Sequence, residues 1–200
     1  MDSKQETKRF YNRIAEQSFK EWVNNPALLP TLKLFINHLP DQPKVLDLGC
    51  GTGGESKRLY ELGADVTGID YSEESLVFAR KHLPQVNFLL MDILKMDFAS
   101  ELFDGVMEAG VLFHFNKIEQ DRILKKIYAI LKIEGVFLSY YMIGDFEGIQ
   151  EKEVSGEKFK RYVRRVSVDK WIKQVLACGF RDYKLPDFEL GPFRCVEFYK

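Results

Sequence analysis

The stretch Val45-Leu-Asp-Leu-Gly-Cys-Gly-Thr-Gly-Gly54 joins a short apolar run directly to a cluster of glycines. An apolar run of this length followed by glycines predicts a buried strand that turns sharply into a helix. Because glycine has no side chain, the backbone of such a turn leaves room for a flat ligand to lie against it. The stretch therefore predicts an α/β fold with a ligand site at its first turn.

The glycine spacing alone is compatible with two classes of nucleotide cofactor. Gly49-x-Gly51-x-x-Gly54 also satisfies the fingerprint of dinucleotide-binding sites. Asp47 separates the two classes, because a carboxylate beside the turn would repel a pyrophosphate and attract an ammonium or sulfonium group. The stretch resembles motif I of the class I S-adenosylmethionine-dependent methyltransferases, whose usual form is close to Val-Leu-Asp-Leu-Gly-Cys-Gly-Thr-Gly. We therefore expect S-adenosylmethionine rather than a nicotinamide cofactor.

The resemblance implies a Rossmann-like α/β fold with a seven-stranded, mostly parallel sheet, an antiparallel last strand and helices on both faces. It covers residues 45–143 well and the outer segments loosely. The turn before the fifth strand reads Leu131-Lys-Ile-Glu-Gly135, where the family commonly has Leu-Lys-Pro-Gly-Gly. Glu108-Ala-Gly-Val111 stands where amino-methylating nucleic-acid enzymes carry Asn/Asp-Pro-Pro-Tyr or Phe. This difference argues against methylation of adenine in DNA.

The hydrophobic pattern alternates strands with helices, independently of that motif. Strands are expected at residues 44–48, 65–70, 86–91, 103–109, 135–143, 180–185 and 194–200. The apolar run 86–91 is typical of a strand buried on both faces. Helix boundaries are indicated by the caps Ser72, Asn116 with Glu119, and Ser167, and by the helix-ending glycines Gly63 and Gly179. The alternation predicts a mostly parallel sheet covered on both faces, and the two successive strands at the end predict a hairpin.

The composition describes a single globular domain. The 200 residues carry 29 basic and 30 acidic side chains, which argues against a general nucleic-acid partner. Cys50, Cys178 and Cys195 are scattered and lack metal-ligand spacing, so we expect free thiols, no metal and a cytoplasmic location. The stretch from Met1 to Arg9 is polar, and no apolar run approaches the length of a membrane span.

Four segments are expected within that one domain of residues 1–200. Residues 1–43 are expected to form an N-terminal helical lid, and residues 44–143 the cofactor-binding core. Residues 144–166 interrupt the alternation as a charged insert on the substrate side. Residues 167–200 complete the domain with a helix and a hairpin. The oligomeric state is left open.

Polar residues at successive strand ends suggest a cofactor site, because ligands of open α/β sheets bind beyond the carboxyl ends of the strands. Asp70 ends the second strand, where its carboxylate can accept both ribose hydroxyls, and Tyr71 can lie against the adenine. The resemblance implies that Asp92 accepts from the adenine amine, with Met91 and Ile93 beside the ring. The expected cofactor-binding residues are Tyr11, Asp47, Gly49, Cys50, Gly51, Gly53, Asp70, Tyr71, Met91, Asp92, Ile93 and Glu108.

Catalysis of methyl transfer requires positioning of the acceptor more than covalent chemistry. Glu108 and His114 are the candidate catalytic residues, each with an alternative. Glu108 is either a base or a charge complement to the cofactor, and His114 is either a base or a structural hydrogen-bond partner. Tyr11 is expected either to close over the cofactor or to pack its helix on the sheet. Of Tyr140 and Tyr141, one should point into the acceptor pocket and the other away.

The basic run Lys158-Phe-Lys-Arg-Tyr-Val-Arg-Arg165 interleaves cations with aromatic and apolar residues. Such a run is usually a solvated face. The alternative is an anionic substrate, or a carboxylate, bound by Arg161, Arg164 or Arg165.

The sequence thus predicts a methyltransferase that moves a methyl group from S-adenosylmethionine to O, N or S of a small molecule. Two other functions stay open: a non-catalytic S-adenosylmethionine-binding sensor or partner subunit, and a nicotinamide-dependent oxidoreductase. A protein or nucleic-acid methyltransferase is the main variant within the favoured class.

Overall fold

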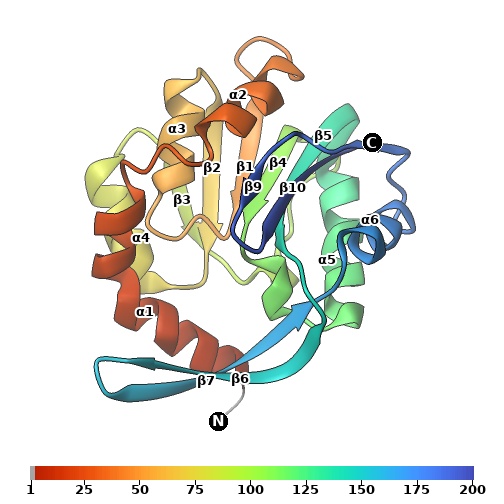
Figure 1. Ribbon diagram of the computed structural model, residues 1–200. Coiled ribbons are helices and arrows are strands. Elements are labelled where there is room, and N and C mark those ends of the chain that lie inside the picture. Colours follow the sequence, from red (N-terminus) through yellow and green to blue (C-terminus); the bar gives the residue numbers. More distant parts are fainter. Residues whose placement is uncertain (1–2) are drawn as a thin grey trace.

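The computed structural model describes residues 3–200, and its elements are labelled in Figure 1. Residues 1 and 2, which begin the polar N-terminal stretch, lie outside the described residues. The helices are α1 (Ser3–Trp22), α2 (Leu29–Asn37), α3 (Gly54–Glu61), α4 (Glu73–His82), α5 (Lys117–Ile130) and α6 (Val168–Leu176), with short 3-10 helices η1 (Ile93–Lys95) and η2 (Leu112–His114). The strands are β1 (Lys44–Leu48), β2 (Asp65–Asp70), β3 (Asn87–Leu90), β4 (Phe103–Ala109), β5 (Leu131–Met142), β6 (Phe146–Val154), β7 (Glu157–Arg165), β8 (Asp182–Lys184), β9 (Glu189–Leu190) and β10 (Phe193–Tyr199).

The main sheet is mixed and follows the order β3-β2-β1-β4-β5-β10-β8, with the short β9 paired to β10. The strands from β3 to β5 are parallel to one another. β10 runs antiparallel to both β5 and β8. The predicted Rossmann-like fold, with an antiparallel last strand, is confirmed. Because the chain places β2 on one side of β1 and β4 on the other, the switch point of the sheet lies beside β1.

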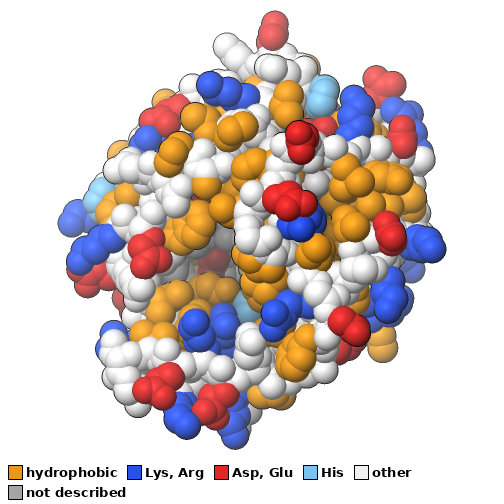
Figure 2. Space-filling model, viewed as in Figure 1, with side chains coloured by type: hydrophobic (Ala, Val, Ile, Leu, Met, Phe, Trp, Pro, Cys, Tyr) orange, Lys and Arg blue, Asp and Glu red, His pale blue; other side chains and the backbone are white. Residues whose placement is uncertain are grey.

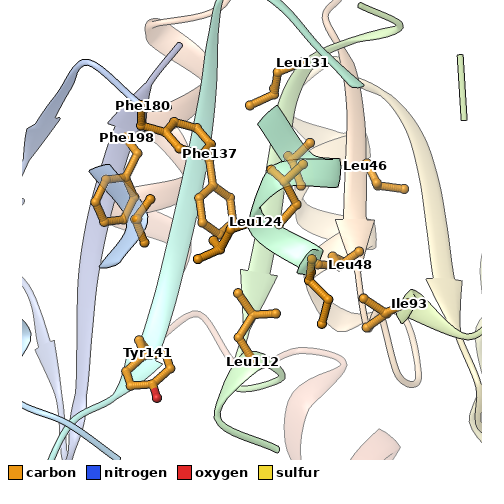
Figure 3. Close-up of a cluster of buried hydrophobic side chains, with 14 of the residues drawn as sticks. Leu46, Leu48, Ile93, Leu112, Leu124, Leu131, Phe137, Tyr141, Phe180 and Phe198 are labelled. Carbon is orange, nitrogen blue, oxygen red and sulfur yellow. The ribbon is translucent and has the colours of Figure 1, made fainter. Parts of the chain in front are cut away.

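Helices cover both faces of the sheet, and successive strand residues pack alternately on them. Val45 belongs to the buried cluster formed with α2, α3 and α4, whereas Leu46 belongs to the cluster formed with α5 and α6. Figure 3 shows part of the second cluster, in which Leu124 of α5 lies near Phe137 of β5. This two-sided core holds the strand ends in fixed positions, which is what a site built on those ends requires.

The carboxyl ends of the central strands face a second layer, which we call the roof and define as α1 together with the hairpin β6–β7 (Figure 1). α1 packs against β7, where the rings of Phe10 and Phe159 meet edge to face with centroids 5.6 Å apart. Ion pairs join Arg9 to Glu157 within the roof and Lys4 of the roof to Glu119 of α5. The roof therefore joins segments that are distant in the sequence.

The expectation that residues 158–165 form a solvated face is wrong. They form β7, in which Lys158 and Lys160 are exposed whereas Phe159, Arg161 and Val163 are buried. Buried and exposed side chains alternate along this part of the strand. Because some of the buried side chains are cations, a hydrophobicity pattern does not reveal the alternation.

The expectation that residues 86–91 form a strand buried on both faces is also wrong. β3 is an edge strand that pairs only with β2, and Leu90 is 48% exposed. A continuous apolar run is compatible with an edge position, because one face still packs on the core through Phe88.

The predicted helix boundaries are confirmed by their hydrogen bonds. The Ser72 and Ser167 hydroxyls accept from backbone N–H groups of the first turns of α4 and α6. Asn116 and Glu119 form a complete capping box at the start of α5. Gly63, just after α3, has a φ of 94°, in the left-handed region.

Replacing Asn116 by alanine is expected to lower the free energy of unfolding by about 1 kcal/mol, because the cap of α5 is lost. Urea denaturation of the purified variant measures the change. Lys117→Ala, in the same turn but exposed, is the control. Equal stability of the two variants would show that the cap contributes nothing.

Cys50, Cys178 and Cys195 are all unpaired. Within residues 3–200 no helix combines the length and the apolar character that a bilayer span requires. The same residues contain no group of three or more His, Cys, Asp or Glu side chains arranged to hold a metal ion.

Candidate functional site

A cavity of about 270 Å³ lies between the carboxyl edge of the sheet and the roof. Figure 2 shows it as a hollow bordered largely by hydrophobic side chains. Its walls come from α1, from the glycine turn after β1, from the ends of β2, β4 and β5, and from the C-terminal strands. Residues on these walls include Tyr11, Gly49, Cys50, Gly51, Asp70, Tyr71, Asp92, Ile93, Ala109, Gly110, His114 and Tyr140. The cavity therefore sits at the switch point, where open α/β sheets bind ligands.

The glycine turn forms one wall of the cavity and has the conformation that glycine permits. Gly49, Gly51 and Gly53 have φ values of 74°, 52° and 85°. The N–H groups of Gly49 and Cys50 both donate to the carbonyl of Ile69, at 2.8 and 3.0 Å. A Cβ placed on Gly51 would meet no protein atom within 4 Å, so this part of the backbone lies open to the cavity. Gly53, in contrast, packs on the core and does not line the cavity.

Asp70 ends β2 and places its carboxylate on the cavity wall beside the glycine turn. One carboxylate oxygen accepts from the Gly51 N–H at 3.0 Å, and the other accepts from the Ser72 N–H at 2.7 Å. Burial raises the pKa of this carboxyl, whereas these backbone hydrogen bonds lower it. Since each oxygen of a carboxylate can accept more than one hydrogen bond, Asp70 keeps acceptor capacity toward the cavity.

Most of the predicted adenine-side residues line the cavity. Tyr71, Asp92 and Ile93 are on its wall, and Asp92 also caps η1 by accepting from the Leu94 N–H at 3.0 Å. Met91 is not on the wall, because its side chain packs against the core cluster of α5 and α6.

Asp47, which separated the two cofactor classes in the sequence, does not reach the cavity wall. Its side chain is 2% exposed and accepts a hydrogen bond from the Ser56 hydroxyl at 2.5 Å. Burial raises the pKa of this carboxyl to about 8. Asp47 is therefore held at the start of α3 and does not line the cavity.

Glu108 is wholly buried and is likewise absent from the cavity wall. Its carboxylate accepts from the Ser139 hydroxyl at 2.6 Å and from the N–H groups of Val111 and Leu112 at 3.0 and 3.3 Å. Burial raises its pKa to about 7. In this structure the carboxylate holds the loop after β4 and does not line the cavity.

Tyr11 and His114 meet across the cavity wall, from α1 and from η2. The Tyr11 hydroxyl lies 2.9 Å from His114 Nε2, and His114 Nδ1 lies 3.1 Å from the carbonyl oxygen of Tyr162. Because a carbonyl can only accept, the network assigns the proton to Nδ1 and makes Nε2 the acceptor of the Tyr11 hydroxyl. Burial lowers the pKa of His114 to about 3. His114 is therefore a neutral hydrogen-bond partner with its only lone pair engaged.

The depressed pKa of His114 makes stability depend on pH. A group whose folded-state pKa lies below the unfolded value of 6.5 contributes stability that is lost as the pH falls from 6.5 toward about 3. Between pH 7 and pH 5 the wild type is expected to lose about 2 kcal/mol relative to His114→Gln. Urea denaturation of both proteins across this range measures the difference. A constant difference would contradict the assigned protonation state.

The two tyrosines at the end of β5 point in opposite directions, as alternation along the strand predicts. Tyr140 lines the cavity, and its hydroxyl hydrogen-bonds that of Thr31. Tyr141 stacks on Trp171 with ring centroids 4.0 Å apart, on the opposite face of the sheet. Of the two, Tyr140 is therefore the one at the cavity.

Several cavity residues had no signal in the sequence. Trp22 is the last residue of α1, and Leu28 lies in the segment after it. Leu190 belongs to β9 and Phe193 to β10. In the sequence these apolar side chains resemble ordinary core residues. They come together on one wall of the cavity only in the folded protein.

Comparisons with known proteins agree with this geometry. Residues 45–135 match the family model of a methyltransferase domain. YqeM, a proposed methyltransferase of Bacillus subtilis, is 38% identical over 105 residues, which are 50% of this chain and 42% of that protein. The phosphoethanolamine N-methyltransferase of Plasmodium falciparum is 27% identical over 181 residues, which are 85% of this chain and 66% of that protein. The chain therefore spans less than two thirds of the length of these curated relatives.

A solved structure shows the same fold. The 1,6-didemethyltoxoflavin-N1-methyltransferase of Burkholderia thailandensis, crystallised with 1,6-didemethyltoxoflavin and S-adenosylhomocysteine, superposes with a TM-score of 0.74. It is 21% identical and covers 98% of this chain and 88% of its own. Residues 45–135 therefore belong to the methyltransferase-domain family, and the mixed sheet that contains them has the fold implied by the resemblance to the class I S-adenosylmethionine-dependent methyltransferases.

Proposed function

We propose that the protein transfers a methyl group from S-adenosylmethionine to an O, N or S atom of a small molecule. The observation that carries the proposal is the position of Asp70, whose carboxylate stands beside the open backbone of Gly51 on one cavity wall. The names of relatives that methylate phosphoethanolamine and 1,6-didemethyltoxoflavin support a small acceptor.

The residues present fit the cofactor. Asp70 supplies acceptors for two ribose hydroxyls, and Asp92 supplies one for the adenine amine. Tyr71 and Ile93 offer flat and apolar surface to the adenine ring. The open space above Gly51 admits the ligand against the backbone. We assign these four side chains and Gly51 to cofactor binding.

When bound, S-adenosylmethionine supplies the activated methyl group, so the chain has to position the acceptor and exclude water. Tyr140 and Phe193 form an apolar part of the wall for this purpose. We assign His114 to positioning Tyr11 of the roof, because its only lone pair is already engaged. We further propose that residues 1–43 act as a lid over the core of residues 44–143, within one domain.

The extent of the cavity supports an enzyme over a sensor. A sensor would need no room beyond its cofactor, whereas this cavity continues from the glycine turn to Trp22, Leu28 and Leu190. That region is the acceptor site in our proposal. The near-neutral charge also supports a small molecule over a nucleic acid. The three unpaired cysteines fit a reducing compartment, and we propose the cytoplasm.

Titration calorimetry of the purified protein with S-adenosylhomocysteine and, in parallel, with NADH tests the proposal. Micromolar binding of S-adenosylhomocysteine and no binding of NADH is the expected result. Binding of NADH alone, or of neither compound, would overturn it. Transfer of radiolabelled methyl groups to a panel of small amines, thiols and oxyanions then separates an enzyme from a sensor.

A further inference from the structure

Arg161 is a buried cation for which the described residues offer no carboxylate partner. Its side chain belongs to β7 of the roof and is 9% exposed. Within residues 3–200 no Asp or Glu oxygen lies close enough to form an ion pair with it, and its Nε has no hydrogen-bond partner. An uncompensated buried charge is costly, so such a group is normally paired or set against a ligand.

Arg161 is not itself on the cavity wall, but it packs on α1 against Phe10, beside Tyr11, which does line the cavity. Its positive charge lowers the pKa of Tyr11, Tyr71 and His114, although burial dominates at each of these groups. All three line the cavity. Its carbon also lies 4.1 Å from the centroid of the Phe10 ring. A cation–π contact does not replace an anionic partner.

The other two arginines of the basic run, Arg164 and Arg165, have partners elsewhere in the protein. Arg164 donates to the side-chain oxygens of Gln120 and Gln174 at 2.5 and 3.0 Å, and it pairs with Glu147 at 3.3 Å. Arg165 is half-buried and lies over the ring of Phe146. Of the three arginines in the basic run, Arg161 alone interacts with several cavity residues.

We propose that Arg161 binds an oxyanion of the methyl acceptor, a carboxylate or a phosphate, and so selects anionic small molecules. The proposal rests on the proposed function, because it assigns a substrate class to the same cavity. The planar guanidinium suits both groups, since it can donate two parallel hydrogen bonds to either. In this proposal Arg161 is a specificity residue that reaches the acceptor from β7 of the roof.

The test uses protein saturated with S-adenosylhomocysteine and two probes, inorganic phosphate and sodium acetate, at constant ionic strength set with chloride. Thermal unfolding is followed as each probe is titrated into wild type, Arg161→Met, Arg161→Lys and Arg165→Met. At least one probe is expected to raise the melting temperature of the wild type. Its apparent dissociation constant should rise at least tenfold in Arg161→Met and stay unchanged in Arg165→Met. The probe that acts separates a phosphate site from a carboxylate site.

Several outcomes would overturn the proposal. One is a wild type that responds to neither probe, and another is an equal response in Arg161→Met. A tenfold loss of S-adenosylhomocysteine affinity in Arg161→Met would instead assign Arg161 to the carboxylate of the cofactor. Arg161→Lys keeps the charge and guards against a variant that fails to fold. Failure of the proposed function is separate, because the wild type would then not bind S-adenosylhomocysteine at all.

Discussion

Replacement of Asp70 by alanine is expected to weaken the binding of S-adenosylhomocysteine at least 100-fold, which corresponds to about 2.7 kcal/mol. The carboxylate would lose its hydrogen bonds to the ribose hydroxyls, and hydrogen bonds to a charged group contribute about 1.5–3 kcal/mol each. The N–H groups of Gly51 and Ser72 would also lose their acceptor, so the turn itself would be less well held. Titration calorimetry measures the change.

Asp65→Ala is the matched control, because Asp65 begins the same strand and is exposed at the opposite end of it. Its affinity for S-adenosylhomocysteine is expected to equal that of the wild type. Asp70→Asn should fall between the two, since the amide keeps one oxygen acceptor. An Asp70→Ala variant that is folded and binds with wild-type affinity would remove Asp70 from the site.

The second large effect is expected at Gly49. An alanine there would place its Cβ 2.3 Å from Cγ2 of Val111, at a φ of 74°. The left-handed conformation disfavours a Cβ by about 1–2 kcal/mol, and overpacking adds about 1–3 kcal/mol. Val111 is β-branched and has few rotamers into which it can move. We expect a loss of about 3 kcal/mol in the free energy of unfolding, measured in urea, together with loss of cofactor binding.

Two further variants separate the causes of that loss. Gly63→Ala has a similar φ of 94° and no atom within 4 Å of the added Cβ, so it reports the conformational cost alone. Gly49→Ala in a Val111→Ala background removes the close contact and should recover the remainder. If Gly49→Ala and Gly63→Ala lower the free energy of unfolding equally, the contact with Val111 does not contribute to the loss.

Sequence patterns predicted the fold because they are local. The glycine turn, the helix caps and the alternation of apolar runs each depend on residues within one element or its boundary. Asp70 and Asp92 were predicted at the cavity for the same reason, since Asp70 ends β2 and Asp92 lies just after β3. Which side chain finds a partner in another element is not local, and the patterns did not predict it.

Asp47 and Glu108 illustrate that limit. Both precede loops at the cavity. However, the Ser56 hydroxyl donates to the Asp47 carboxylate, and the Ser139 hydroxyl donates to the Glu108 carboxylate, so both carboxylates are held in the core. Each serine lies in a different element from its carboxylate, so the sequence around the carboxylate does not predict the hydrogen bond. Arg161 shows the reverse case, because burial of a cation on a charged strand is visible only after α1 has packed on β7.

Two partly exposed ion pairs help to hold the roof in place. In the Arg9–Glu157 and Lys4–Glu119 pairs, three of the four side chains are 40–45% exposed, while Glu119 is 18% exposed. Electrostatic attraction between partly exposed charges is screened as dissolved salt shortens the Debye length, which is about 10 Å at 0.1 M. The Lys4–Glu119 pair joins the roof to α5, and Lys4 also lines the cavity. Ligands that part this pair should therefore associate and leave faster as ionic strength rises, so that salt concentration changes the exchange rate of the site through one residue at its margin.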